Sequence, residues 1–175
     1  MKRLFAALLC AVMLVSLLPV GAQAAHSYTS DWRRWSQGAS GVESMKKGCR
    51  LVAQAKLMKE AGVVPKDFNP DSWYSWMKKN DGFLSGINER GNTGDKMMEY
   101  LKGQGVKVTR KSVSLSGKTA AERVNLIQSL INQGYYVILE KSGHQTYVSR
   151  VDSLKYKTPI ISDSGGSIKR SAMYY

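Results

Sequence analysis

The chain is poor in cysteine and histidine, with only 2 of each among its 175 residues. Cys10 lies in an apolar N-terminal run, so removal of that run would leave Cys49 as the single thiol. A single cysteine excludes an internal disulfide framework and a zinc site built from several thiolates. Cys49 is therefore a small buried side chain, a partner in an intermolecular disulfide, or a reactive thiol.

Acidic residues are also scarce, with 13 Asp and Glu against 26 Lys and Arg, which gives a formal net charge of +13. The basic residues are spread along the chain and form no block with interleaved aromatic residues, which argues against a nucleic-acid partner. The excess charge indicates either general solubility or an anionic partner such as a cell-wall polymer or a membrane surface. The sequence has no metal-ligand cluster and no nucleotide-binding loop, so we expect no metal and no cofactor.

Only one long apolar run occurs, and it lies at the N-terminus. Leu4–Leu18 follows a positively charged start and is too short for a comfortable membrane span. Ala22-Gln23-Ala24 then gives the small-x-small pattern that signal peptidase cleaves. We expect a signal peptide over residues 1–24, cleavage after Ala24, and one exported, monomeric domain over residues 25–175, either secreted or associated with the cell surface.

Hydrophobic periodicity predicts helices first and strands afterwards. We expect helices over 48–61, 71–79, 95–102 (capped by Thr93 or Asp95) and from the capping box at Thr119 to Gly134, with a glycine-rich lid or connector over 82–94. We expect strands over 106–113, 135–140, 145–151 and 159–162, and a last one over 168–173. Helices followed by an antiparallel sheet predict an α+β domain.

Cys49 is placed where a thiol can be activated. Gly48 precedes it and the periodic helix follows, which puts the thiol in the first helical turn. The unpaired N–H groups and the helix dipole there favour an anion, as do Lys46, Lys47 and Arg50. The same N–H groups can stabilise an oxyanion during acyl transfer. A small, packed residue at a helix start is the structural alternative.

A thiolate nucleophile needs a base, and His144 is the histidine best placed to supply it. His144 follows the predicted Ser142-Gly143 hairpin turn, whereas His26 lies just after the expected cleavage site. Asp163, at the end of a predicted strand, could orient the imidazole. Asp152 is a rival, in an expected turn where a capping role is the alternative.

Three stretches of the chain resemble one family of enzymes. The first runs from Asp31-Trp-Arg-Arg-Trp-Ser36 to Gly48-Cys49, the second is Gly134-Tyr-Tyr-Val-Ile-Leu139 followed by Gly143-His144, and the third is Pro159-Ile-Ile-Ser-Asp163. This ordered set resembles the papain-like cysteine peptidases of the bacteriocin-processing (double-glycine leader) type, especially their secreted single-domain relatives.

The resemblance implies a papain-like fold, in which the helix that carries the nucleophile packs on an antiparallel sheet. It implies Cys49 as nucleophile, His144 as general base and Asp163 as its partner, acting on a peptide or amide bond through a thioester. Peptides, proteins or cell-wall-associated amides would be the substrates. The upstream glutamine of such families falls near Ser30 here, so Gln37 is the nearest candidate for an oxyanion donor.

Other readings of the same residues remain open. The chain could be a weakly active or inactive binding module of this fold on an anionic cell surface. It could also be an acyltransferase, because an amine can intercept a thioester. The tryptophans form either core or a substrate groove; they are Trp32, Trp35, Trp73 and Trp76.

Overall fold

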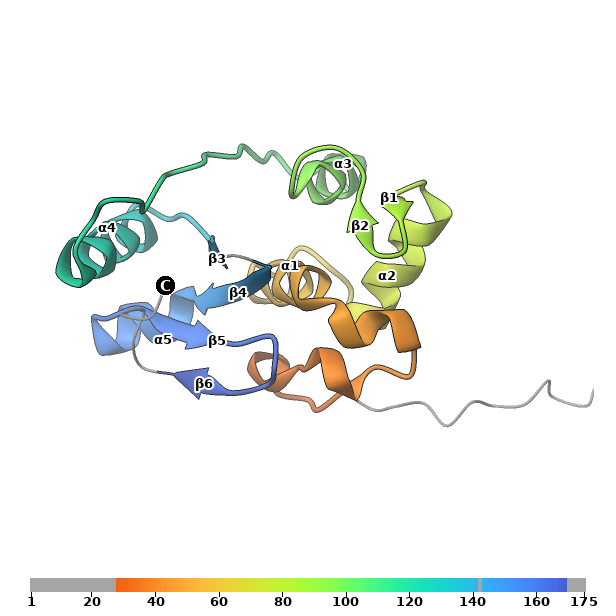
Figure 1. The fold of residues 1–175 in the computed structure, drawn as a ribbon, viewed down its shortest axis with the longest axis horizontal. Helices are drawn as coiled ribbons and strands as arrows, with labels where there is room; N and C mark the ends of the chain where they lie inside the picture. The colour runs from red at the N-terminus through yellow and green to blue at the C-terminus, as the bar shows by residue number, and fades with distance from the viewer. Residues whose placement is uncertain (1–27, 142, 170–175) are drawn as a thin grey trace, which may run out of the picture.

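The computed structural model describes residues 28–141 and 143–169. The expected signal peptide, its cleavage site and His26 lie outside these residues. The described part is a mixed helical and antiparallel-sheet structure, so the α+β class is confirmed (Figure 1). No helix in it has the length and apolar character needed to cross a membrane.

Helix α1 (Cys49–Glu60) is the central element of the molecule (Figure 1). Within residues 28–48, three 3₁₀ turns precede it: η1 (Trp32–Arg34), η2 (Gln37–Ala39) and η3 (Glu43–Lys47). One side of α1 packs against α2 (Pro70–Lys79), which Asn69 caps. The main core lies here and includes the fully buried Trp73, with Trp76 stacked on it at 5.2 Å between ring centroids. Core packing is therefore the role of this tryptophan pair.

The segment after α2 differs from the predicted loop. A short hairpin forms from β1 (Phe83–Ser85) and β2 (Asn88–Glu89). Helix α3 (Asp95–Gly103) then starts after Gly94, whose φ of 84° is in the left-handed region. Neither Thr93 nor Asp95 caps α3, contrary to the prediction, because the Asp95 carboxylate instead accepts the N–H of Asn92 at 2.8 Å.

Residues 106–118, which we call the strap, connect α3 to α4 (Ala120–Asn132) and arch across one side of the molecule (Figure 1). The predicted strand over 106–113 is wrong, since the structure has no helix or strand there. Its residues alternate as in a half-exposed strand, but no described strand pairs with them. The capping box that starts α4, between Thr119 and Glu122, is confirmed.

The second half of the domain forms a four-stranded antiparallel sheet in the order β3-β4-β5-β6. Its strands are β3 (Val137–Lys141), β4 (His144–Ser149), β5 (Ile160–Ser162) and β6 (Ile168–Lys169). Helix α1 packs along β4, and Ile127 and Ile131 of α4 pack on the other face, against Leu139, Val148 and Ile161. The end of the last predicted strand, beyond Lys169, lies outside the described residues.

The predicted strand over 145–151 ends early, at Ser149, because a helix begins there. The Ser149 hydroxyl accepts the N–H of Asp152, and α5 (Arg150–Tyr156) follows. The Glu60 carboxylate of α1 accepts the N–H groups of Arg150 at 2.8 Å and Val151 at 3.0 Å. Asp152 therefore lies in a helix, and not in the expected turn.

Candidate functional site

Cys49 is the first residue of α1, and Gly48 makes this placement possible. The Gly48 N–H donates to the Met45 carbonyl oxygen at 2.7 Å, which turns the chain sharply from η3 into α1. A Cβ atom at Gly48 would lie 2.9 Å from that oxygen and 3.0 Å from the Met45 sulfur. Only glycine fits here without movement of the backbone, so Gly48 fixes the position of Cys49 at the start of the helix.

Gly48→Ala should therefore lower the free energy of unfolding by about 1–3 kcal/mol, as overpacking against a backbone atom does. Gly103→Ala is the matched control, because a Cβ atom there meets nothing within 4 Å and the residue ends a helix. Urea unfolding of both variants measures the difference. Equal stability of the two variants would show that the turn at Gly48 relaxes freely.

The Cys49 thiol lies against the β3–β4 hairpin corner. Its sulfur is 4.0 Å from the carbonyl oxygen of Gly143, the residue before His144. Gly143 has a φ of 75°, which suits glycine in this turn. Among the described residues, the partner of the thiol is this carbonyl oxygen and not the imidazole. The helix start and the hairpin corner therefore lie side by side, and the predicted contact between the Cys49 sulfur and the His144 ring stays a prediction.

The imidazole of His144 is bound by Asp163. Nε2 of His144 is 3.2 Å from Oδ2 of Asp163. The other carboxylate oxygen, Oδ1, accepts the N–H of Gly165 at 2.7 Å, and the Asp163 N–H donates to the Ser167 carbonyl at 2.9 Å. The tight turn after β5 therefore holds the carboxylate, and the carboxylate holds the ring with Nδ1 as the remaining nitrogen.

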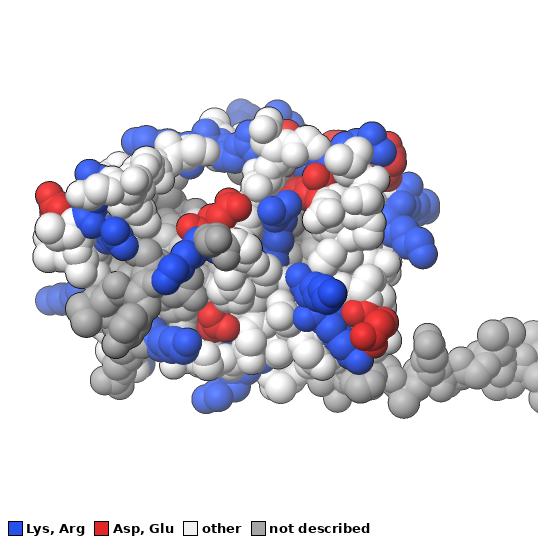
Figure 2. All heavy atoms as spheres, in the orientation of Figure 1, with Lys and Arg blue, Asp and Glu red and all other residues white. Residues whose placement is uncertain are grey.

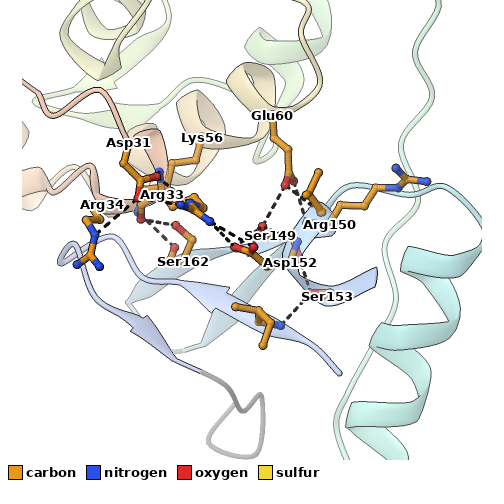
Figure 3. Close-up of polar contacts among 12 residues, drawn as sticks. Asp31, Arg33, Arg34, Lys56, Glu60, Ser149, Arg150, Asp152, Ser153 and Ser162 are labelled. Carbon is orange, nitrogen blue, oxygen red and sulfur yellow. Dashed lines mark hydrogen bonds and ion pairs between the residues drawn. The ribbon is translucent and has the colours of Figure 1, made fainter. Parts of the chain in front are cut away.

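Asp152, the rival for this role, lies elsewhere. Its carboxylate receives Nη1 of Arg33 at 3.3 Å and the Ser149 hydroxyl at 3.2 Å (Figure 3). Arg33 also binds Asp31, through Nε at 2.7 Å. This cluster joins η1 to α5, and within the described part of the chain the imidazole is bound by Asp163 and not by Asp152, so Asp152 belongs to a structural ion-pair network.

Ser164 connects the elements of the site, and the sequence analysis missed it. Its buried hydroxyl lies 2.9 Å from the Cys49 carbonyl oxygen and 2.7 Å from that of Gln145. Its own carbonyl accepts the backbone N–H of Gln37 at 2.9 Å. A serine after a strand-end aspartate gives no signal in a single sequence, because its partners come from three distant segments.

Gln37 reaches the site through Ser164. It begins η2. The preceding residue, Ser36, forms a β-bridge with Gly165, and this bridge joins η2 to the end of the sheet. The Gln37 side-chain oxygen is buried and has no hydrogen-bond partner among the described residues. Ser164 therefore connects Gln37 to Cys49, and the unpaired atom of the Gln37 amide is its oxygen, a hydrogen-bond acceptor.

A buried lysine binds the backbone of Asp163. Lys56 is fully buried, and its Nζ donates to the carbonyl oxygens of Asp163 at 2.7 Å, Arg33 at 3.1 Å and Ser162 at 3.4 Å. Figure 3 shows Lys56 reaching from α1 toward η1 and β5. Burial lowers the pKa of Lys56 to about 7, and the nearby Asp163 carboxylate acts in the opposite direction. Lys56 directly follows Ala55 and comes one helical turn after Val52, both of which are buried, and this spacing is a signal in the sequence that Lys56 is buried too.

The far end of α1 is held by Glu60. Its carboxylate accepts the Ser149 hydroxyl at 3.0 Å, besides the two α5 N–H groups (Figure 3). It also accepts the Tyr147 hydroxyl. Burial, together with the Glu60 charge, raises the pKa of Tyr147 well above its ordinary value. Glu60 therefore ties the C-terminal end of α1 to the end of β4 and the start of α5.

The glycine-rich segment of residues 82–94 is bound to α1 through buried groups. Gln54 accepts the Trp73 indole N–H at 2.8 Å and donates to the Glu89 carboxylate at 3.1 Å. Glu89 also accepts the Gly94 N–H at 3.1 Å, and burial raises its pKa. These contacts favour a fixed connector over a mobile lid.

No group of three or more potential metal-ligating side chains occurs in the described part of the chain. Comparison of the sequence and structure with protein-family models, curated proteins and solved structures found no match. The geometry of the site is therefore the basis for any assignment of function.

Proposed function

We propose that the protein is an exported thiol hydrolase with a papain-like arrangement of Cys49, His144 and Asp163. One observation carries the proposal: the Cys49 sulfur lies 4.0 Å from the residue before His144, while Asp163 holds the His144 ring at 3.2 Å. A nucleophile at the start of α1, a base at the start of β4 and an orienting carboxylate just after β5 thus lie near one corner of the sheet. This is the grouping that activates a nucleophile in covalent catalysis.

The chemistry follows from these positions. Cys49 Sγ attacks the carbonyl carbon of an amide, and Nδ1 of His144 takes the thiol proton and returns it to the leaving amine. The thioester is then hydrolysed by a water that His144 deprotonates. The first-turn N–H groups of α1 face the developing oxyanion, with the Gln37 amide as a second donor. In the resting geometry the thiol faces the Gly143 carbonyl, so the sulfur or the ring turns toward its partner when substrate binds.

Alkylation of the thiol tests the proposal. We expect iodoacetamide to modify Cys49 rapidly at about pH 6, and peptide mapping to identify the site. His144→Ala should slow this reaction by about tenfold or more, because the imidazolium no longer stabilises the thiolate. His26→Ala is the matched control and should react like the parent chain. A thiol that reacts only after unfolding, or equally fast without His144, would leave the binding-module alternative in place.

A further inference from the structure

A cavity of about 660 Å³ separates the strap from the sheet. Figure 2 shows the opening beneath the strap, with basic side chains along its upper rim. Its walls are formed by strap residues 110–116 on one side and by Tyr136 and residues 138–141 on the other. Gln54 and Leu57 of α1 and Gln145 of β4 also line it. Its volume is in the range of about 300–1,000 Å³ that is usual for ligand sites.

Two extended backbone segments border this cavity. Strand β3 is at the edge of the sheet, so one side of its backbone pairs with no described strand. Across the cavity, residues 107–114 of the strap are extended, and within the described chain none of their backbone groups pairs with another backbone group. A free sheet edge accepts an extended peptide as an additional strand.

Gln145 supplies a second and independent indication of a ligand. It is 3% exposed and lines the cavity, yet neither Oε1 nor Nε2 has a hydrogen-bond partner among the described residues. A buried amide without partners costs about 1–3 kcal/mol, so its retention here calls for an explanation. Its donor and acceptor together match those of one peptide group.

The charges around the cavity favour an acidic ligand. Of the charged residues that line it, four are basic and Glu140 alone is acidic; the basic ones are Arg110, Lys111, Arg123 and Lys141. Arg110 is already paired with Asp95 at 2.7 Å, but the excess of positive charge remains. A polypeptide segment with carboxylate side chains complements this wall.

We propose that the cavity binds an extended, acidic segment of a polypeptide, which adds a strand to the β3 edge and hydrogen-bonds to the Gln145 amide. The bound strand would run toward the corner where Lys141 pairs with His144 and where Cys49 meets Gly143. As an assignment of the substrate class, this inference rests on the hydrolase function proposed above.

Fluorescence anisotropy on the full chain carrying Cys49→Ser tests the binding directly. The probe is a fluorescein-labelled peptide of about nine residues that alternates valine and glutamate, long enough to cover a five-residue strand. A valine–lysine peptide and an N-methylated valine–glutamate peptide are the comparison ligands. We expect the acidic peptide to bind at least about tenfold more tightly than either of them, because the first comparison reverses the charge and the second removes backbone donors.

Two substitutions locate the site. Lys111→Glu should weaken binding of the acidic peptide about tenfold, whereas Lys107→Glu, a strap lysine that does not line the cavity, should have little effect. Gln145→Leu should weaken binding about tenfold while the domain stays folded, since leucine fills the same space without unpaired polar atoms. Absence of binding, equal binding of the three peptides, or equal effects of the two lysine variants would overturn the proposal.

Hydrogen exchange distinguishes a bound peptide from the other possible occupant of the β3 edge, which is the strap itself. In the free protein, the amides of residues 107–114 and those β3 amides that point away from β4 should exchange quickly, and the acidic peptide should slow these β3 amides. Slow exchange of both groups of amides before addition of peptide would show that the strap pairs with the free edge of β3, which contradicts the proposal. Because binding is measured without the Cys49 thiol, its failure leaves the hydrolase proposal intact. Conversely, an inert thiol in a chain that binds the peptide would refute only the hydrolase.

Discussion

Mixing the full chain with p-nitrophenyl acetate should give a burst of p-nitrophenol close to one equivalent of protein, followed by slow turnover. The burst reports acylation of the Cys49 sulfur, and the slow phase reports hydrolysis of the thioester. Cys49→Ala should abolish the burst, because the proposed acyl intermediate forms on the Cys49 sulfur. Stopped-flow absorbance measures both phases with a simple activated ester, so the natural substrate need not be known.

The size of the effect at His144 separates a catalytic pair from an isolated thiol. His144→Ala should lower the acylation rate by about 10²–10⁴-fold, which is the usual contribution of a positioned general base. His26→Ala, the matched change at the other histidine, should leave the rate unchanged. A burst that survives in the Cys49→Ala variant would show that another residue is acylated, and the proposed nucleophile would then be wrong.

Local sequence patterns are sufficient to place residues that lie at the ends of helices and strands. Gly48 before a periodic helix placed Cys49 at the start of α1, and the Ser142-Gly143 turn placed His144 at a hairpin corner. Asp163 follows a short buried strand, as predicted from the apolar run before it. Each of these positions depends on interactions between near neighbours in the chain, so composition and periodicity are sufficient to predict it.

The supporting contacts could not be predicted in this way because they join distant segments. Lys56 and Asp163 are 107 residues apart in the sequence, and Glu60 and Val151 are 91 apart. A lysine or glutamate on a helix is ordinarily exposed, and only the packed fold shows that these two are engaged with backbone groups. Ser164 is similar, since its hydroxyl becomes meaningful only when α1 and β4 lie beside it.

Two errors in the predicted elements have the same physical origin. Residues 106–113 have the alternation of a strand, but strand formation requires a partner edge, and the strap lies across a cavity from β3. Residues 150 and 151 are predicted to continue the strand, but Ser149 and the remote Glu60 carboxylate accept the first N–H groups of a helix. In both places the outcome depends on distant segments: the strap has no partner edge beside it, and at α5 a remote carboxylate stabilises a helix.

Replacement of Lys56 by methionine should change both the stability of the protein and its dependence on pH. The pKa of Lys56 in the folded protein, about 7, is below its ordinary value of 10.5. Between these values the unfolded chain binds more protons than the folded chain, so the free energy of unfolding rises with pH, by up to ~1.4 kcal/mol per pH unit. Below about 7 both states carry the ammonium, and the contribution of Lys56 no longer changes.

Lys56→Met should lack this rise, and urea unfolding at a series of pH values between 7 and 10.5 measures it as the difference between variant and parent. Lys59→Met is the matched control on the same helix. The Lys59 ammonium lies at the surface, where it donates to the Pro65 carbonyl at 3.1 Å, so this variant should keep the pH dependence of the parent. Parallel stability curves for Lys56→Met and the parent would contradict the prediction.

The same substitution connects stability to the site. Methionine fills the volume of Lys56 but leaves the carbonyl oxygens of Asp163, Arg33 and Ser162 without their donor. Buried carbonyl groups without partners favour local movement, and Asp163 is the residue that orients His144. Lys56→Met should therefore slow acylation by p-nitrophenyl acetate at temperatures where the domain is still folded, while Lys59→Met should not. A slower burst in a fully folded variant would identify Lys56 as a positioning residue that acts through Asp163.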